Sequence, residues 1–83
     1  PRAVSAGGSG STRADAVEAL TPRQREVLLL IARGLSNSEI EAELGITRAT
    51  CRSHITALLA RLGARDRAQL VIAAYESGLI SAR

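Results

Sequence analysis

The sequence predicts a small all-α domain, and three of its features favour this fold class. Four segments each begin with a helix-capping residue and end at or near a glycine. Within them apolar residues recur at spacings of three and four, whereas no segment alternates apolar and polar residues over the length of a strand. A chain of 83 residues holds one domain at most. We therefore expect a compact four-helix domain.

The first residues differ in composition from the rest of the chain. Residues 1–14 are rich in glycine and serine, so they bury too little apolar surface to offset the entropy lost on folding. Residues 15–20 can form one helical turn that leads into the domain. We accordingly assign residues 1–19 to a flexible linker or tether and residues 20–83 to the folded domain.

Capping boxes predict where the first two helices of the domain begin. Thr21 is suited to the N-cap, with Gln24 three residues later, and this helix ends at Gly34. Ser36 and Glu39 form the second box, which starts a short helix that ends near the next glycine.

The third and fourth helices are marked in the same way. The third is capped by Thr47 and runs to about Arg61 before a glycine ends it. The fourth is capped by Asp66, with Gln69 three residues later, and ends near Gly78.

The second and third helices together form the unit that indicates function. A short helix, a tight turn that contains Gly45 and a longer helix with a polar outer face make up a helix-turn-helix. In DNA-binding proteins of this kind the second of the two helices enters the major groove.

The third helix has one apolar face and one polar face when its residues are placed about 100° apart. The apolar face should pack in the core and comprises Cys51, Ile55, Leu58, Leu59 and Leu62. The outer face combines small side chains with polar or cationic ones, namely Ala49, Arg52, Ser53, Thr56 and Ala60. Hydrogen-bonding and cationic groups flank it at Thr50, His54 and Arg61.

Charge is divided between the two helices of this unit. The second helix carries three glutamates, whereas residues 46–67 carry five arginines against one aspartate, in a chain of net charge +3. A polyanion would meet the basic region. Charge alone favours a solvated surface, and the helix-turn-helix pattern reverses this interpretation in favour of nucleic acid.

The fourth helix is apolar nearly all round. One stripe is expected to pack on the core and contains Ala68, Val71, Ile72, Tyr75 and Leu79. The other stripe is left over and predicts a dimer interface at Leu70, Ala73 and Ala74. The alternative is that both stripes are buried in one monomer. A dimer would place two recognition helices about 34 Å apart on a two-fold DNA site.

Several other classes of protein are disfavoured by the composition. No apolar run approaches the roughly 18 residues of a membrane span, and no secretion signal is visible. The single cysteine, Cys51, fits a reducing cytoplasm. A lone cysteine and a lone histidine, His54, supply neither a metal ligand set nor a nucleophile–base pair. We therefore expect a cytoplasmic protein without catalytic residues, metal, cofactor, small-molecule ligand or membrane contact.

Several segments together resemble the DNA-binding domain of LuxR/NarL-type regulators, and the resemblance covers about residues 20–82. The matching segments are residues 20–28, 34–40, 47–62, 62–67 and 74–79. The resemblance implies a four-helix DNA-binding domain, usually C-terminal in a transcription regulator and often preceded by a receiver domain, as in two-component response regulators. It also implies dimerisation through the last helix.

The resemblance implies roles for particular residues and partners. The family's base-contacting positions fall on Arg52, Ser53 and Thr56. Its positions that contact the DNA backbone fall on or near Thr47, Arg48, Thr50, His54 and Arg61. The implied partners are double-stranded DNA, a second copy of the chain and RNA polymerase.

The sequence departs from the family pattern at three positions. Cys51 replaces a usual valine, and we expect it to be a small core side chain. Glu41 replaces an alanine at the crossing of the two helices, so it must snorkel or pair with an arginine. Thr56 stands where a basic residue is common, which predicts a weaker contact there and a narrower base preference carried by Arg52.

Two alternatives to such a regulator remain. The promoter-binding fourth region of a sigma factor also resembles residues 25–30 and 44–46, but the long apolar fourth helix argues against it. A helical protein-interaction module that has lost DNA binding is the other alternative, and Glu41 keeps it open. The salt dependence of DNA affinity separates DNA binding from a protein-interaction module, because each phosphate contact contributes a slope of about −0.9.

Overall fold

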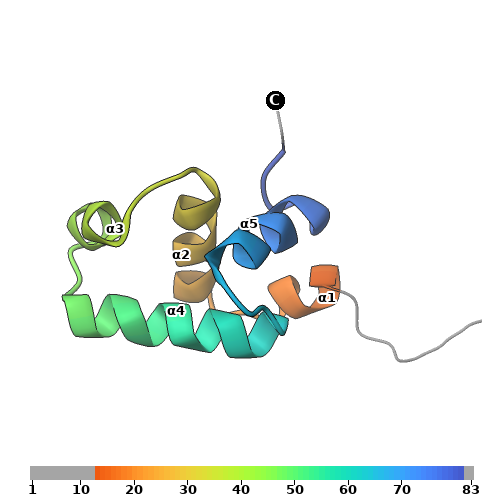
Figure 1. Cartoon of the computed structure of the whole chain (residues 1–83), viewed down its shortest axis with the longest axis horizontal. Coiled ribbons are helices and arrows are strands. Elements are labelled where there is room, and N and C mark those ends of the chain that lie inside the picture. The colour runs from red at the N-terminus through yellow and green to blue at the C-terminus, as the bar shows by residue number, and fades with distance from the viewer. Residues whose placement is uncertain (1–12, 82–83) are drawn as a thin grey trace, which may run out of the picture.

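The computed structural model describes residues 13–81, which contain five α-helices and no strand. In chain order the helices are α1 (Arg13–Glu18), α2 (Pro22–Ala32), α3 (Asn37–Leu44), α4 (Arg48–Leu62) and α5 (Arg67–Glu76) (Figure 1). The all-α fold class is confirmed, and α2 to α5 are the four expected helices.

The N-caps of the predicted helices are confirmed at atomic detail. In the box before α2, the Thr21 hydroxyl accepts from the Gln24 N–H at 3.1 Å, and the Gln24 side chain accepts from the Thr21 N–H at 3.1 Å. The box before α3 has the same pattern, with Ser36 and Glu39 at 3.2 and 2.7 Å. These bonds satisfy N–H groups that a helix start leaves without partners.

Single capping bonds begin the last two helices. The Thr47 hydroxyl accepts from the Thr50 N–H at 3.1 Å, and the Asp66 carboxylate accepts from the Gln69 N–H at 3.0 Å. The side chain of Gln69 turns to the Arg65 N–H at 2.8 Å instead of the cap residue. The cap of α5 is therefore a variant of the box in which the second bond reaches one residue further back.

The turn of the helix-turn-helix depends on a glycine. Gly45 ends α3 with φ +65° and ψ 39°, the left-handed conformation that a Cβ atom disfavours. The Ile46 N–H donates to the Glu41 carbonyl at 3.1 Å, which closes the end of the helix. This turn directs the chain from α3 into α4.

The core is formed by side chains from all five helices and the α1–α2 turn. Its buried members are Val17, Leu20, Val27, Leu28, Ile31, Ile40, Cys51, Leu58, Leu62, Leu70, Ala73 and Ala74. Helix α2 lies at the centre, where it packs against α3, α4 and α5. The core therefore fixes α4 along one whole side.

The residues just before the expected domain boundary are helical and packed. Val17 is 4% exposed and Leu20 is 3% exposed, and α1 contacts both α4 and α5. The assignment of residues 13–19 to a flexible tether is therefore wrong, because these apolar side chains reach the core. The rest of the expected tether lies outside the described residues.

The buried face of α5 differs from the one expected, although Val71 and Leu79 of the expected stripe are partly buried against the core. Leu70, Ala73 and Ala74 are each 0% exposed, so they are corrected from a dimer interface to the core of the monomer. Ile72 and Tyr75, expected in the core, are 49% and 39% exposed. The two alanines are small, and they face the core on the helix that packs most extensively against α2.

Within residues 13–81, no helix combines the length and the apolar character needed to cross a membrane.

Candidate nucleic-acid interface

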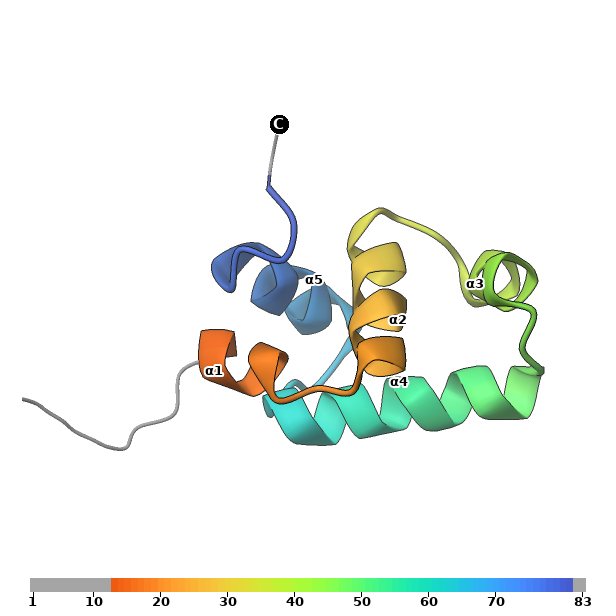
Figure 2. The same ribbon diagram turned by 180° about the vertical axis from the view of Figure 1, so that it is seen from behind.

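Helix α4 lies along one edge of the molecule. In two views related by a half-turn, the other four helices all lie on the same side of it (Figure 1, Figure 2). Nothing in the described part of the chain covers its outer side. The longest helix, with 15 residues, therefore has one face in the core and one face open to a partner.

The inner face of α4 is the one predicted from the helical pattern. Cys51, Leu58 and Leu62 are buried, and Ile55 and Leu59 are half-buried against the core. Because the side chains of a helix project at fixed angles around its axis, the burial of these side chains determines which residues point outward.

Arg52, Ser53 and Thr56 point outward and are exposed. They line an open hollow on the outer face of α4 with three alanines, Ala49, Ala57 and Ala60. Within residues 13–81, the side chains of Arg52, Ser53 and Thr56 form no hydrogen bond or ion pair. Their donors and acceptors are therefore available to a partner that enters the hollow.

The residues expected to contact a phosphate backbone lie around this face. Arg48, Thr50 and Arg61 are exposed, and His54 is half-buried. Thr47 is exposed too, but its hydroxyl donates to the Thr50 hydroxyl at 3.0 Å while it accepts from the Thr50 N–H. The structure thus gives Thr47 a capping role and leaves the Thr50 hydroxyl proton available to an acceptor.

One arginine of the basic region donates hydrogen bonds to other residues of the domain. Of the five arginines in residues 46–67, four are exposed, whereas Arg67 is half-buried. Its Nη1 donates to Asn37 Oδ1 at 2.7 Å, and its Nη2 donates to the Leu35 carbonyl. Sequence reasoning missed this contact, and the only local signal was the position of Arg67 directly after a helix cap.

The crossing of α3 and α4 contains the two unusual residues Cys51 and Glu41. Cys51 is 1% exposed, in agreement with the expected core role. Its burial raises the pKa of the thiol, the negative charge of Glu41 raises it further, and the positive charge of Arg67 lowers it. Glu41 is half-buried, and within residues 13–81 it forms no ion pair with an arginine.

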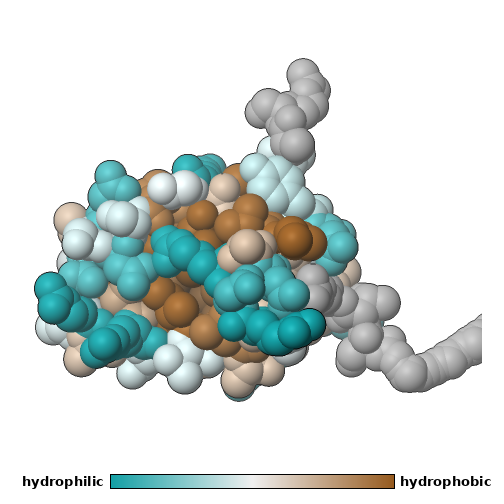
Figure 3. Space-filling view, viewed as in Figure 1, coloured by the Kyte–Doolittle hydropathy of each residue, from teal (hydrophilic) through white to brown (hydrophobic). Residues whose placement is uncertain are grey.

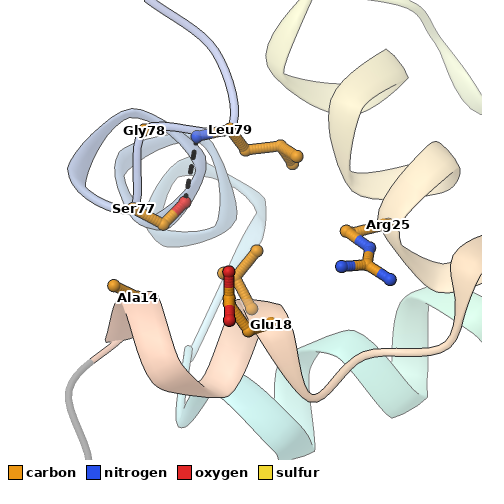
Figure 4. A pocket seen from close by; sticks show the side chains of 7 residues that line it. Ala14, Glu18, Arg25, Ser77, Gly78 and Leu79 are labelled. Atoms are coloured by element: carbon orange, nitrogen blue, oxygen red, sulfur yellow. Dashed lines mark hydrogen bonds between the residues drawn. The ribbon is translucent and has the colours of Figure 1, made fainter.

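A separate hollow of about 220 Å³ lies between α1, α2 and the end of α5 (Figure 4). Glu18 and Arg25 lie on two sides of it and Leu79 points into it, where the Leu79 N–H donates to the Ser77 hydroxyl at 3.3 Å. This hollow shares no residue with the outer face of α4. Among the described residues, no three His, Cys, Asp or Glu side chains are grouped closely enough to hold a metal ion.

Comparisons with known proteins agree with this geometry. The response regulator protein VraR of Staphylococcus aureus (strain Mu3 / ATCC 700698) is 46% identical over 68 residues, which are 82% of this chain and 32% of VraR. VraR proteins of Staphylococcus saprophyticus and Staphylococcus epidermidis show the same identity and coverage. The crystal structure of response regulator ChrA in a heme-sensing two-component system matches with a TM-score of 0.70 and 35% identity, over 75% of this chain and 31% of ChrA.

The chain therefore spans about a third of the length of the relatives that it matches. Residues 18–74 match the bacterial regulatory proteins of the luxR family, which is more than half of the 83 residues. The match begins at the last residue of α1 and ends inside α5, so it includes the whole helix-turn-helix. This chain belongs to the luxR family of bacterial regulatory proteins.

Proposed function

We propose that this domain binds double-stranded DNA with sequence specificity through α4, which enters the major groove, and that it thereby regulates transcription. The observation that carries the proposal is the exposed outer face of α4, where Arg52, Ser53 and Thr56 surround small side chains. A major groove about 12 Å wide admits a helix only if the facing side chains let it approach the base edges. The family is one of regulators and not a class of enzymes, which supports the same function.

Base recognition would depend mainly on Arg52. Its guanidinium can donate two parallel hydrogen bonds to the O6 and N7 atoms of guanine, the most frequent specific contact in the major groove. Ser53 and Thr56 offer hydroxyls that donate or accept and therefore discriminate less sharply. The domain should thus prefer sites with a guanine opposite Arg52.

The flanking residues would hold α4 in register on the DNA. Arg48, Thr50 and Arg61 are exposed and can contact phosphates, with His54 beside them and Thr47 at the helix start. Phosphate contacts position a protein without selecting a sequence. Their charge should also make the affinity fall as salt concentration rises.

The domain would act as the output part of a longer cytoplasmic response regulator. Relatives in three Staphylococcus species are named response regulators, and this chain spans about a third of their length. A receiver domain elsewhere in such a protein would supply the signal that controls binding.

The second part of the proposal is a homodimer through the exposed face of α5. Ala68, Ile72 and Tyr75 are exposed at spacings of four and three residues, so they share one side of the helix. Figure 3 shows apolar surface gathered over α5 and α2. An apolar patch of this kind on a small domain favours contact with a second copy. The surface replaces the one first expected at Leu70, Ala73 and Ala74.

Selection of binding sites from random duplexes, followed by salt titration, tests the proposal. We expect one enriched sequence motif with two-fold symmetry, and an affinity that falls with log salt at a slope of about −0.9 per phosphate contact. Sedimentation of the complex should show two domains on each two-fold site, and Ile72→Asp should lower this number. No enriched motif and a flat salt response would instead favour a protein-interaction module.

A further inference from the structure

Arg67 links two parts of the fold that lie far apart in the sequence. It is the first residue of α5, and its guanidinium donates both to Asn37 Oδ1 at 2.7 Å and to the Leu35 carbonyl. Leu35 belongs to the turn before α3, and Asn37 is the first residue of α3. One side chain therefore joins the start of α5 to the start of the helix-turn-helix.

Helix α3 has few other anchors in the core. Of its eight residues only Ile40 is fully buried, and Leu44 is partly buried against the core. The helix lies at the end of the molecule where α4 begins, away from α1 (Figure 1, Figure 2). Because apolar burial anchors α3 at only these two residues, the hydrogen bonds from Arg67 at its start should add to its positioning, the partly buried bond to the Leu35 carbonyl more than the exposed bond to Asn37.

An arginine suits this place better than a lysine. The backbone N–H of Leu35 donates to the Leu30 carbonyl at 3.1 Å. The guanidinium of Arg67 donates to the carbonyl of Leu35, so both backbone polar groups of this residue have a partner. The planar guanidinium offers separate N–H groups to the two acceptors at once. A lysine ammonium would keep the charge but lacks this fixed fork.

We propose that Arg67 is a positioning residue for DNA recognition, and this inference rests on the proposed function. Arg67 holds the first turn of α3 and thereby determines how α3 packs against α4. Because the turn at Gly45 is short, the position of α3 also determines where the recognition helix begins. Arg67 acts through Asn37 and Leu35, so it should affect the discrimination between DNA sequences more than the general attraction to DNA.

The test compares Arg67→Ala, Arg67→Lys and Asn37→Ala with a matched control, Arg65→Ala. Arg65 is exposed, and within the described residues its side chain makes no hydrogen bond or ion pair, so its loss removes the same charge without the contacts. Affinity is measured for the selected duplex and for a random duplex. Thermal unfolding and circular dichroism check that each variant folds. If Arg67→Ala does not fold, Arg67→Lys and Asn37→Ala provide the test instead.

We expect Arg67→Ala to weaken binding to the selected duplex about tenfold, the loss that corresponds to one charged hydrogen bond. Binding to the random duplex should fall only as much as in Arg65→Ala. Arg67→Lys should recover part of the loss, and Asn37→Ala should have little further effect when Arg67 is already alanine. Equal losses on both duplexes, with full recovery by lysine, would identify Arg67 as a phosphate contact and overturn the proposal.

Amide hydrogen exchange supplies a second readout that needs no DNA. Exchange should become faster over residues 40–44 of α3 in Arg67→Ala, while the buried centres of α2 and α5 keep their protection. Unchanged exchange in α3 overturns the positioning role. Failure of the proposed function is seen separately, because the wild-type domain would then bind both duplexes equally.

Discussion

Helices α4 and α5 pack against the same core. The sequence predicts correctly which residues of α4 are buried, but it predicts those of α5 only in part. On α4 the expected inner residues, among them Leu58, are buried, and the expected outer residues, among them Arg52, are exposed. On α5 the buried face is rotated from the expected one, with Leu70 buried and Ile72 half exposed, whereas Val71 packs against the core as expected.

The difference comes from the contrast between the two faces of each helix. Helix α4 carries arginine, histidine and hydroxyl side chains on one side. Burial without partners would cost on the order of 1–3 kcal/mol for each hydroxyl and more for each charged arginine. Helix α5 is apolar on both sides, so transfer from water favours neither face. The choice then depends on fit, and the small side chains of Ala73 and Ala74 face the core.

The largest effect is expected from paired substitutions on the two faces of α5. Leu70→Ala should lower the free energy of unfolding by about 2–5 kcal/mol, because it leaves a cavity in a fully buried site. Ile72→Ala should cost less than about 1 kcal/mol, because half of this side chain is already in water. Urea unfolding of the two variants measures both values. A larger loss for Ile72→Ala would restore the orientation first expected.

The next effect tests the outer face of α4. Arg52→Ala should weaken binding to the selected site by about 1–3 kcal/mol and relax the base preference, because a bidentate contact to a base is lost. Arg61→Ala should weaken all sequences about equally and reduce the salt slope by about one. Titrations on selected and random duplexes at several salt concentrations distinguish the two. If Arg52→Ala reduced both affinities by the same factor, the assignment of base recognition to this face would be wrong.

Removal of the N-caps of α4 and α5 should lower the free energy of unfolding by similar amounts but should affect DNA affinity differently. Thr47→Ala and Asp66→Ala each remove one capping bond and should each cost about 1 kcal/mol of unfolding free energy. Only Thr47→Ala should also weaken DNA binding, because Thr47 lies at the start of the proposed recognition helix. Thr47→Ser keeps the hydroxyl and serves as the control. Equal weakening by Asp66→Ala on both the selected and the random duplex would place the start of α5 in the DNA interface as well.

The smallest effect concerns the inner face of α4 at alkaline pH. Because the pKa of the Cys51 thiol is raised in the folded state, the unfolded chain loses this proton first, from about pH 8.5 upward. The contribution of the protonated thiol to stability is therefore complete below that pH and is lost as pH rises through the folded-state pKa. Stability of the wild type should therefore fall relative to Cys51→Val as the pH rises above about 8.5. A constant difference would mean that the thiol is solvated.

Arg67 and α1 show a further limit of prediction from sequence. The pattern marked Arg67 only as part of a basic region, although its partners Leu35 and Asn37 lie 32 and 30 residues away. For α1, the sequence predicts a single helical turn, but no local feature indicates that Val17 reaches the core. Both features depend on which distant segments the fold brings together.

The sequence by itself determined where α2 to α5 begin and end and which side of α4 faces outward. Caps, glycines and an amphipathic pattern act within a few residues, and they have the same effect in any fold that contains them. Only the tertiary structure decided which side of α5 is buried, that α1 joins the core, and that Arg67 links α5 to α3. These outcomes depend on shape and on polar groups from distant segments, which no local pattern of residues specifies.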